Sequence, residues 1–159
     1  MKGKQLEIPK WGPFLRNQWC ERFAGHLTPE EQNEIYLDSF LWHLCSWERI
    51  HSLKNRDAAQ AFHGQKKKKC TIFYQFVDEA FLIDHAGSLT ADQLPYDRRH
   101  MDYGDLYVMD WELRWTFVMT HEEKCGLTSS EYNKHPSGRG WMFVSDLIPL
   151  LFYFFELKQ

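Results

Sequence analysis

The stretch CTIFYQFVDEAFLIDH, residues 70–85, decides the fold because it reads as two strands joined by a short turn. CTIFYQF and AFLIDH are rich in aromatic and β-branched residues, which favour strands, and residues 77–79 between them suit a turn. A second pair of this kind follows in DLYVMDWELRWTFVMT, residues 105–120, with its turn around residues 111–113. Two hairpins predict an antiparallel sheet of about four strands.

A first helix is predicted ahead of these hairpins. Apolar residues recur every three or four positions along this segment, which is the spacing of one helix face. The helix is entered through Gly12 and Pro13 and ends near Gly25. The face expected to lie on the core consists of Trp11, Phe14, Leu15, Trp19 and Phe23.

A second and longer helix is predicted over residues 28–53. Thr28 suits the capping position, Pro29 suits the first helical position, and Glu31 completes a capping box. The helical stripe places Phe40, Leu41, Leu44 and Trp47 inward, and Asp38, Trp42, Cys45 and Arg49 on the flank or outside. Shorter helices are expected at residues 57–62 and after Thr90.

Together these elements predict an α+β domain of two layers, with N-terminal helices packed on a mainly antiparallel sheet. A chain of 159 residues is long enough for one such core. We place the domain at residues 1–122. Residues 123–140, rich in Gly, Ser, Pro and charge, form a loop or linker. Residues 141–159 form an apolar C-terminal segment that is docked or lies at an interface.

Charge and cysteine usage restrict the class of function. The net charge is −3, so the chain as a whole offers no field that attracts nucleic acid, and only the run Lys66–Lys69 is strongly basic. Four widely spaced cysteines and an N-terminus without a signal-peptide pattern favour reduced thiols in the cytoplasm. The acids Asp146 and Glu156 disfavour a membrane span in the apolar C-terminal segment, although that segment leaves membrane contact open.

Residues that could carry metal or thiol chemistry are scattered. The sequence lacks a glycine-rich phosphate-binding motif, and no cofactor is predicted. The weak metal candidates are His121 with Cys125, which are close in sequence, and His85 as a further ligand. Cys70 follows the lysine run, whose charge would favour a thiolate if the side chain were exposed. The carboxylates Asp102 and Asp105 are expected to be solvated.

Aromatic content is where the composition departs most from the average. Aromatic residues make up 16% of the chain and include seven Trp, which is more than a core of this size normally fills. Because Trp is enriched at protein interfaces, some of these side chains are candidates for a partner surface. The candidate binding residues are Trp42, Trp47, Trp111 and Trp115.

The order of several segments resembles a known family. WGPFLRNQWCERFAGHL, EIYLDSFLWHLCSWE, CTIFYQFVDEAFLI, SLTADQL and WTFVMTHE follow one another as in an uncharacterised family of small Gram-positive bacterial proteins, a domain of unknown function. The resemblance covers about residues 8–122 and leaves the apolar C-terminal segment outside. It transfers no catalytic residue to this chain.

These observations favour a small non-enzymatic intracellular protein that binds a protein partner, similar in character to antitoxins, immunity proteins or regulators. Oligomerisation through the apolar segment stays open. The alternative is a hydrolase- or transferase-type enzyme whose site is assembled between helix and sheet. Its candidate residues are His43, His85, His121 and Cys70.

Overall fold

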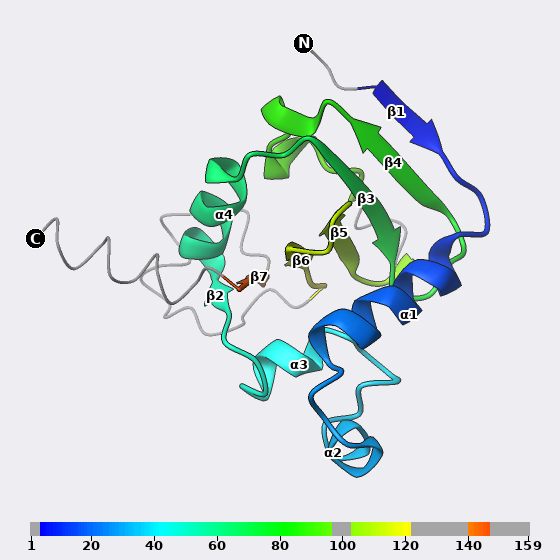
Figure 1. Ribbon diagram of the computed structural model, residues 1–159, viewed down its shortest axis with the longest axis vertical. Helices are drawn as coiled ribbons and strands as arrows, with labels where there is room; N and C mark the ends of the chain where they lie inside the picture. Colours follow the sequence, from blue (N-terminus) through cyan, green and yellow to red (C-terminus); the bar gives the residue numbers. More distant parts are fainter. Residues whose placement is uncertain (1–3, 97–102, 122–139, 147–159) are drawn as a thin grey trace, which may run out of the picture.

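The computed structural model describes residues 4–96, 103–121 and 140–146, which are built around one antiparallel sheet (Figure 1). Its strands are β1 (Lys4–Glu7), β2 (Leu53–Lys54), β3 (Lys69–Tyr74), β4 (Ala80–Asp84), β5 (Leu106–Asp110), β6 (Trp115–Met119) and β7 (Trp141–Ser145). They pair in the order β1-β4-β3-β5-β6-β7-β2. The predicted α+β class is confirmed, but the sheet has seven strands where about four were predicted.

Both predicted hairpins are present, as β3–β4 and β5–β6. The three additional strands carry weaker local signals. All four residues of β1 are exposed, β2 has two residues, and β7 belongs to the apolar C-terminal segment. β7 lies between β6 and β2, with Phe143 opposite both Phe117 and Leu53. Residues 141–145 are therefore part of the sheet, while residues 123–139 of the predicted linker and residues 147–159 of the apolar segment lie outside the described residues.

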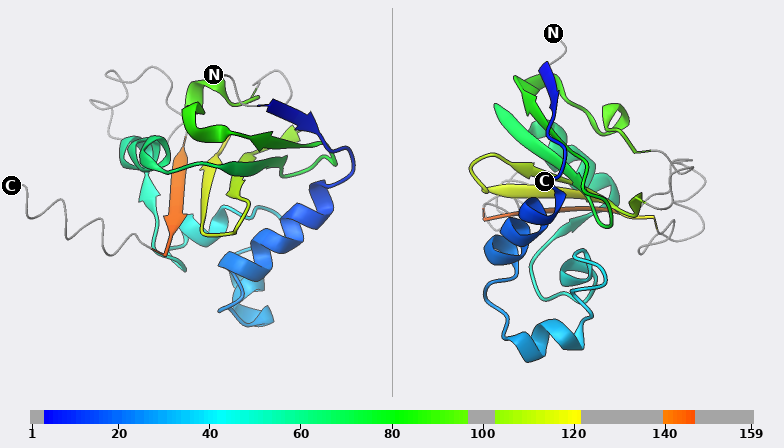
Figure 2. Two further views of the ribbon diagram at one scale, coloured as in Figure 1. Left: turned by 45° about the horizontal axis from the view of Figure 1, so that its top comes forward. Right: turned by 90° about the vertical axis from the view of Figure 1, so that its right-hand side faces the viewer.

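Helices cover both faces of the sheet, so the predicted two-layer arrangement is wrong. The helices are α1 (Gly12–Phe23), α2 (Pro29–Glu34), α3 (His43–Ser46) and α4 (Asn55–Gly64), with single 3-10 turns η1 (Ala86–Ser88) and η2 (Ala91–Gln93). One buried cluster joins α1 and α3 to the sheet, and another joins α4, η1 and η2 to the opposite face. Figure 1 and Figure 2 show α1 and α4 well apart, with the central strands between them.

Alternation along the strands explains why both faces are apolar. In β5, Tyr107 and Met109 belong to the cluster under α1, whereas Leu106 and Val108 belong to the cluster under α4. Successive side chains of a strand point to opposite faces, so a strand buried on both sides is apolar throughout. Every residue of β5 and β6, and every residue of β7 after its first, is buried, which reflects this double burial.

The predicted helix over residues 28–53 is wrong, because the chain turns twice within it. The capping box of Thr28 and Glu31 is present, but α2 ends at Glu34 and Tyr36 follows in the left-handed region with φ 53°. The bonds from Leu37 N to Gln32 O and from Tyr36 N to Asn33 O form a Schellman ending. α3 ends in the same way at Glu48, whose φ is 55°.

Between the end of α2 and the start of α3, backbone N–H groups donate hydrogen bonds to side chains on or next to the sheet. Leu41 N donates to Gln75 Oε1 at 3.1 Å, and Trp42 N donates to Tyr107 Oη at 3.3 Å. In a continuous helix the carbonyls four residues earlier would accept these bonds. The side chains of Gln75 and Tyr107 therefore accept the hydrogen bonds that helix carbonyls would otherwise accept. These acceptors are distant in sequence, so a local pattern does not predict them.

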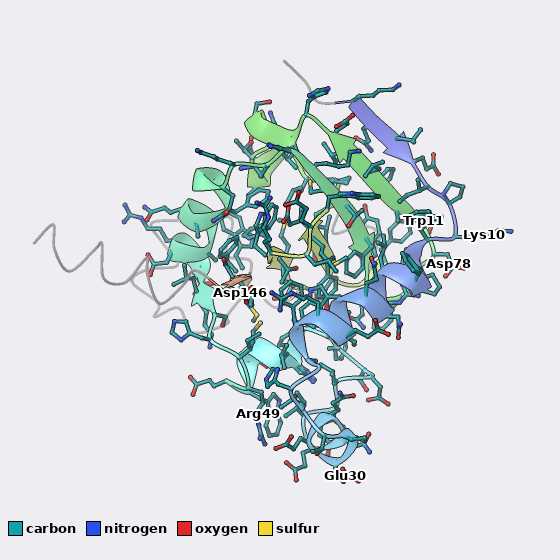
Figure 3. The ribbon with its side chains drawn as sticks, viewed as in Figure 1. Lys10, Trp11, Glu30, Arg49, Asp78 and Asp146 are labelled. Carbon is teal, nitrogen blue, oxygen red and sulfur yellow. The ribbon has the colours of Figure 1, made fainter. Side chains whose placement is uncertain are left out.

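α1 agrees with the prediction and is fixed to the β3–β4 turn. Gly12 N donates to Asp78 O at 2.9 Å, and a Cβ at Gly12 would lie 2.5 Å from Val77 O. Arg16 then donates to the carbonyls of Tyr74 at 3.0 Å and Val77 at 2.8 Å. Figure 3 shows Trp11 and Asp78 close together where α1 begins. This contact sets the position of the first turn of α1 over the sheet.

Candidate functional site

A pocket of about 220 Å³ opens between the first turns of α1 and the β5–β6 turn. Three of the aromatic side chains that line it are unusually exposed: Trp11 (43%), Phe14 (52%) and Trp111 (48%). Its other lining residues are Leu15, Gln18, Thr71, Met109, Asp110 and Leu113. The pocket thus combines an apolar floor with an aromatic rim contributed by two distant parts of the sequence.

The rings at the rim are held in place by neighbouring groups. Trp11 and Phe14 meet edge to face, with centroids 5.5 Å apart. Lys69 Nζ lies 5.1 Å from the centroid of Trp111, and Trp111 N donates to Lys69 O at 3.1 Å. These contacts preorganise the rim, which lowers the entropy cost of binding.

The one carboxylate of the pocket is already neutralised. Asp110 Oδ2 accepts a bond from Arg114 Nε at 2.7 Å and from Arg114 N at 3.2 Å. These bonds raise the pKa of Arg114 above its ordinary value. Because Asp110 has its counter-charge, the pocket presents mainly apolar surface to a ligand.

Leu113, which lines one wall of the pocket, has a strained backbone conformation. It follows Asp110 in the turn, donates from its N to Asp110 O at 2.9 Å, and has φ 59°. A left-handed conformation is uncommon for a residue other than Gly, Asn or Asp, and such strain is enriched at functional sites. Arg22 Nε donates to Leu113 O at 2.9 Å, which ties this wall to α1.

A second cluster of functional groups lies at the other end of β5. Asp105 is fully buried, and its Oδ1 accepts bonds from His121 N at 2.7 Å and His121 Nδ1 at 2.8 Å. Its Oδ2 accepts a bond from Trp42 Nε1 at 2.8 Å. The expectation that Asp105 is solvated is therefore wrong.

The four predicted tryptophans do not lie together. Trp42 and Trp115 are buried in the core, on opposite faces of the sheet, whereas Trp47 and Trp111 are exposed. The predicted orientation of Trp42 and Trp47 is the reverse of the observed one, because residues 35–42 are not helical. Cys45, also expected on the flank, is buried, so of the four only Trp111 lines the pocket.

The predicted metal candidates are separated. His85 follows Asp84, which pairs with Lys69 at the end of the sheet that holds Asp110, whereas His121 contacts Asp105 at the other end. Cys125 lies outside the described residues. Within residues 4–96, 103–121 and 140–146, no three His, Cys, Asp or Glu side chains are grouped to hold a metal ion.

The three thiols that the structure describes, those of Cys20, Cys45 and Cys70, are not activated. Burial is the main cause that raises the pKa of Cys45 and of Cys70 to about 12 and that of Cys20 to about 11. Cys70 is fully buried, so the lysine run does not give it an exposed thiolate. Lys67, which follows α4 in the chain, is buried. Its Nζ donates a hydrogen bond to Phe62 O, in the last turn of that helix, at 2.6 Å.

Sequence reasoning missed Trp11 and Phe14 as surface residues. The buried stripe of α1 consists of Gly12, Leu15, Trp19 and Phe23, and the pocket is lined by the neighbouring stripe of Trp11, Phe14 and Gln18. Both stripes obey a spacing of three or four residues. The signal that distinguishes the two stripes is an offset of one position: Trp11 and Phe14 each directly precede a residue of the buried stripe.

The fold and site define an α+β domain with a helix-covered, seven-stranded antiparallel sheet and an aromatic pocket at one end of β5. The chain belongs to the family described as Domain of unknown function (DUF4275), whose model matches residues 1–127. This confirms the predicted resemblance to an uncharacterised family. No curated protein and no solved structure matches the chain.

The match ends before β7, although β7 lies between two strands of the sheet. Within the described residues no helix has the length and apolar character needed to cross a membrane.

Proposed function

We propose that this protein is a non-enzymatic, intracellular protein-binding module, and that it holds an apolar side chain of its partner in the pocket between α1 and the β5–β6 turn. The observation that carries the proposal is the convergence of three exposed aromatic side chains, Trp11, Phe14 and Trp111, on one pocket. Exposed aromatic residues around a pocket are typical anchors of protein interfaces.

The size of the pocket favours a protein partner over a metabolite. Small-molecule sites usually enclose about 300–1,000 Å³, which is more than the 220 Å³ found here. A cavity of this size accommodates one or two side chains. Its neutralised carboxylate and apolar floor favour an aliphatic or aromatic anchor. Such a stoichiometric binder has the general character of an antitoxin, an immunity protein or a regulator.

Trp47 provides a matched control for testing the surface. It is exposed to 50%, almost the same as Trp111 at 48%, but it directly follows α3 as its C-cap residue and does not line the pocket. A photo-crosslinking amino acid is placed at position 111 or at position 47 in the full chain, which is expressed in its host and irradiated. We expect a covalent adduct with one protein from position 111 and none from position 47.

The binding affinity of each variant for the crosslinked protein then measures how much the Trp111 side chain contributes to binding. Trp111→Ala is expected to weaken binding tenfold or more, as truncation of an interface anchor does, while Trp47→Ala leaves it unchanged. Both variants are expected to keep the wild-type circular dichroism spectrum, since neither side chain is buried. Equal crosslinking from the two positions, or equal loss of affinity in the two variants, would exclude the pocket as the binding site.

A further inference from the structure

β1 is an open edge of the sheet. It pairs with β4 and is the outermost strand in the order, so no described strand lies on its other side. Figure 1 shows β1 at the margin of the molecule, with no helix beyond it. The opposite edge is β2, which has two residues and continues directly into α4. Because a very short edge strand gives a second chain little to pair with, β1 is the edge at which a further strand can add.

The backbone groups of two residues point outward from this edge. Ile8 N donates to Ala80 O at 2.9 Å, so these two residues form a hydrogen-bonded pair of the β1–β4 ladder. Such pairs alternate along antiparallel strands, and Leu6 therefore also bonds inward to β4. Gln5 and Glu7 lie at the alternate positions and direct their N–H and C=O groups away from the sheet. A strand of another chain would form its hydrogen bonds with these groups.

The side chains of β1 suit a second copy of the same strand. All four residues are exposed, and the apolar Leu6 is exposed to 51%. Leu6 lies opposite Leu82 of β4, which is half-buried. Directly opposite residues of antiparallel strands carry their side chains on the same face of the sheet. An identical strand placed against β1 would therefore complete a row of four leucines across four strands.

We propose that this protein forms a twofold symmetric dimer in which β1 pairs antiparallel with β1 of a second copy, with Leu6 opposite Leu6. In this register Gln5 of each copy forms a hydrogen-bonded pair with Glu7 of the other, which gives about four backbone hydrogen bonds. A shift of two residues also keeps the hydrogen-bonding groups in phase. One such shift places Glu7 against Glu7, and the other places Leu6 against Lys4, so both lose favourable side-chain pairs.

The symmetry limits this assembly to two copies. Pro9 has no N–H, so the ladder cannot continue beyond Glu7 in the same phase. The contact is isologous, which means that it uses the β1 edge of both copies at once. The dimer then ends at each side in β2, whose two residues are a poor template for further pairing.

The pairing surface is separate from the partner pocket. The described residues that line this pocket include none from β1 or β4. Each copy in the dimer therefore keeps its own pocket. The dimer is bivalent for the partner, which raises the apparent affinity for a partner that is itself multivalent. This consequence rests on the proposed function, whereas the pairing of β1 does not.

Sedimentation velocity of the full chain measures the self-association. We expect a shift from monomer to dimer as the concentration is raised toward about 1 mM, where weak specific complexes form. Leu6→Glu removes the leucine contact and places two like charges opposite each other, so it is expected to weaken the dimer tenfold or more. Trp47→Glu brings the same charge to an apolar position of almost equal exposure, 50%, outside β1. It is expected to leave the dimer unchanged.

Gln5→Pro tests the backbone hydrogen bonds of the pairing. The N–H of Gln5 points away from β4, and Pro is tolerated in an edge strand where the N–H faces solvent. We expect this variant to lose the dimer and to keep the circular dichroism spectrum of the wild-type protein. A dimer as stable as that of the wild-type protein would exclude pairing through the β1 backbone.

Disulfide formation tests the register. A Leu6–Leu6 pair that is not hydrogen-bonded places the two Cα atoms about 4.5 Å apart, within the range of a disulfide. Leu6→Cys is therefore expected to give a disulfide-linked dimer on mild oxidation, with the linked peptides identified by mass spectrometry. Lys4→Cys is the control, because in this register the two copies of position 4 lie roughly 14 Å apart. It is expected to give no such link.

The outcomes also separate this proposal from the partner pocket. A monomer at every concentration, equal effects of Leu6→Glu and Trp47→Glu, or equal crosslinking of Leu6→Cys and Lys4→Cys would overturn the dimer. Trp111→Ala is expected to leave the dimer unchanged. Leu6→Glu is expected to retain the photo-crosslink from position 111, so either proposal can fail without the other.

Discussion

At the scale of single residues, the core depends on a few buried polar pairs. Trp19 and Thr116 are both fully buried, and Trp19 Nε1 donates to Thr116 Oγ1 at 2.9 Å. The same hydroxyl donates to Val108 O at 2.9 Å. α1 is therefore joined to β5 and β6 through one threonine, and a hydrophobic residue of the same shape cannot replace its hydrogen bonds.

Thr116→Val is expected to lower the free energy of unfolding by about 1–3 kcal/mol, because it leaves the buried Trp19 N–H without an acceptor. Urea unfolding followed by Trp fluorescence measures this change. Thr71→Val is the matched control. Thr71 is also buried, but its hydroxyl makes only a 3.4 Å bond to Met109 O, so its loss is expected to cost less. An equal cost in both variants would show that the Trp19 bond contributes nothing.

At the scale of elements, β7 determines whether the sheet is complete. It pairs with β6 over residues 141–145 and with β2 over two residues. α4 packs over β7 on one face of the sheet, and Met142 and Val144 join the cluster under α1 on the other. A strand that lies outside the family match thus supports the packing of α4 and of the N-terminal helices.

Phe143→Ala tests this role of β7. Phe143 is fully buried and its ring stacks on Trp115 with a centroid distance of 6.0 Å. We expect a loss of about 3–5 kcal/mol in the free energy of unfolding, as for other buried Phe→Ala changes. Phe14→Ala, at a position that is 52% exposed, is expected to cost about 0.5 kcal/mol or less. Similar losses in chemical denaturation of the two variants would argue against a structural role for β7.

At the scale of the whole molecule, stability is expected to depend on alkaline pH through the buried thiols. Burial raises the pKa of Cys20 to about 11 and that of Cys45 and Cys70 to about 12, from an ordinary value of 9.0. At a pH between 9.0 and the raised pKa of each thiol, the thiol stays protonated in the folded state and ionises in the unfolded state. The folded state then binds more protons, so the free energy of unfolding falls as pH rises above about 9.

Each thiol is expected to contribute a slope of up to about 1.4 kcal/mol per pH unit. Burial lowers the pKa of Lys67 below its ordinary value of 10.5. As pH approaches 10.5 the unfolded state therefore binds more protons at this lysine than the folded state does, and this raises the free energy of unfolding, opposite to the effect of the thiols. Urea unfolding at pH 7.5, 9 and 10 measures the net slope. Cys45→Ala is expected to make the slope shallower without reversing it, and a stability that is constant or rising between pH 9 and 10 would contradict the assignment.

The parts of this protein that the sequence by itself determined are those that depend on neighbouring residues. The two hairpins, α1, the capping box of Thr28 and the short helical turn after Thr90 follow from spacing, propensity and local hydrogen bonds. These interactions connect residues within a few positions of one another. A single chain is sufficient to read them, and the structure has them where the patterns predict.

Tertiary structure alone decided the features on which the candidate sites depend. Residues 28–53 do not form one helix because Gln75, 34 residues from Leu41, accepts a backbone bond there. Trp42 is buried because Asp105, 63 residues away, accepts its N–H. Local propensity cannot foresee either acceptor. The partner pocket and the Asp105–His121 pair exist only because the sheet brings such distant residues together, and hydrogen bonds and apolar burial at those contacts outweigh the local preference.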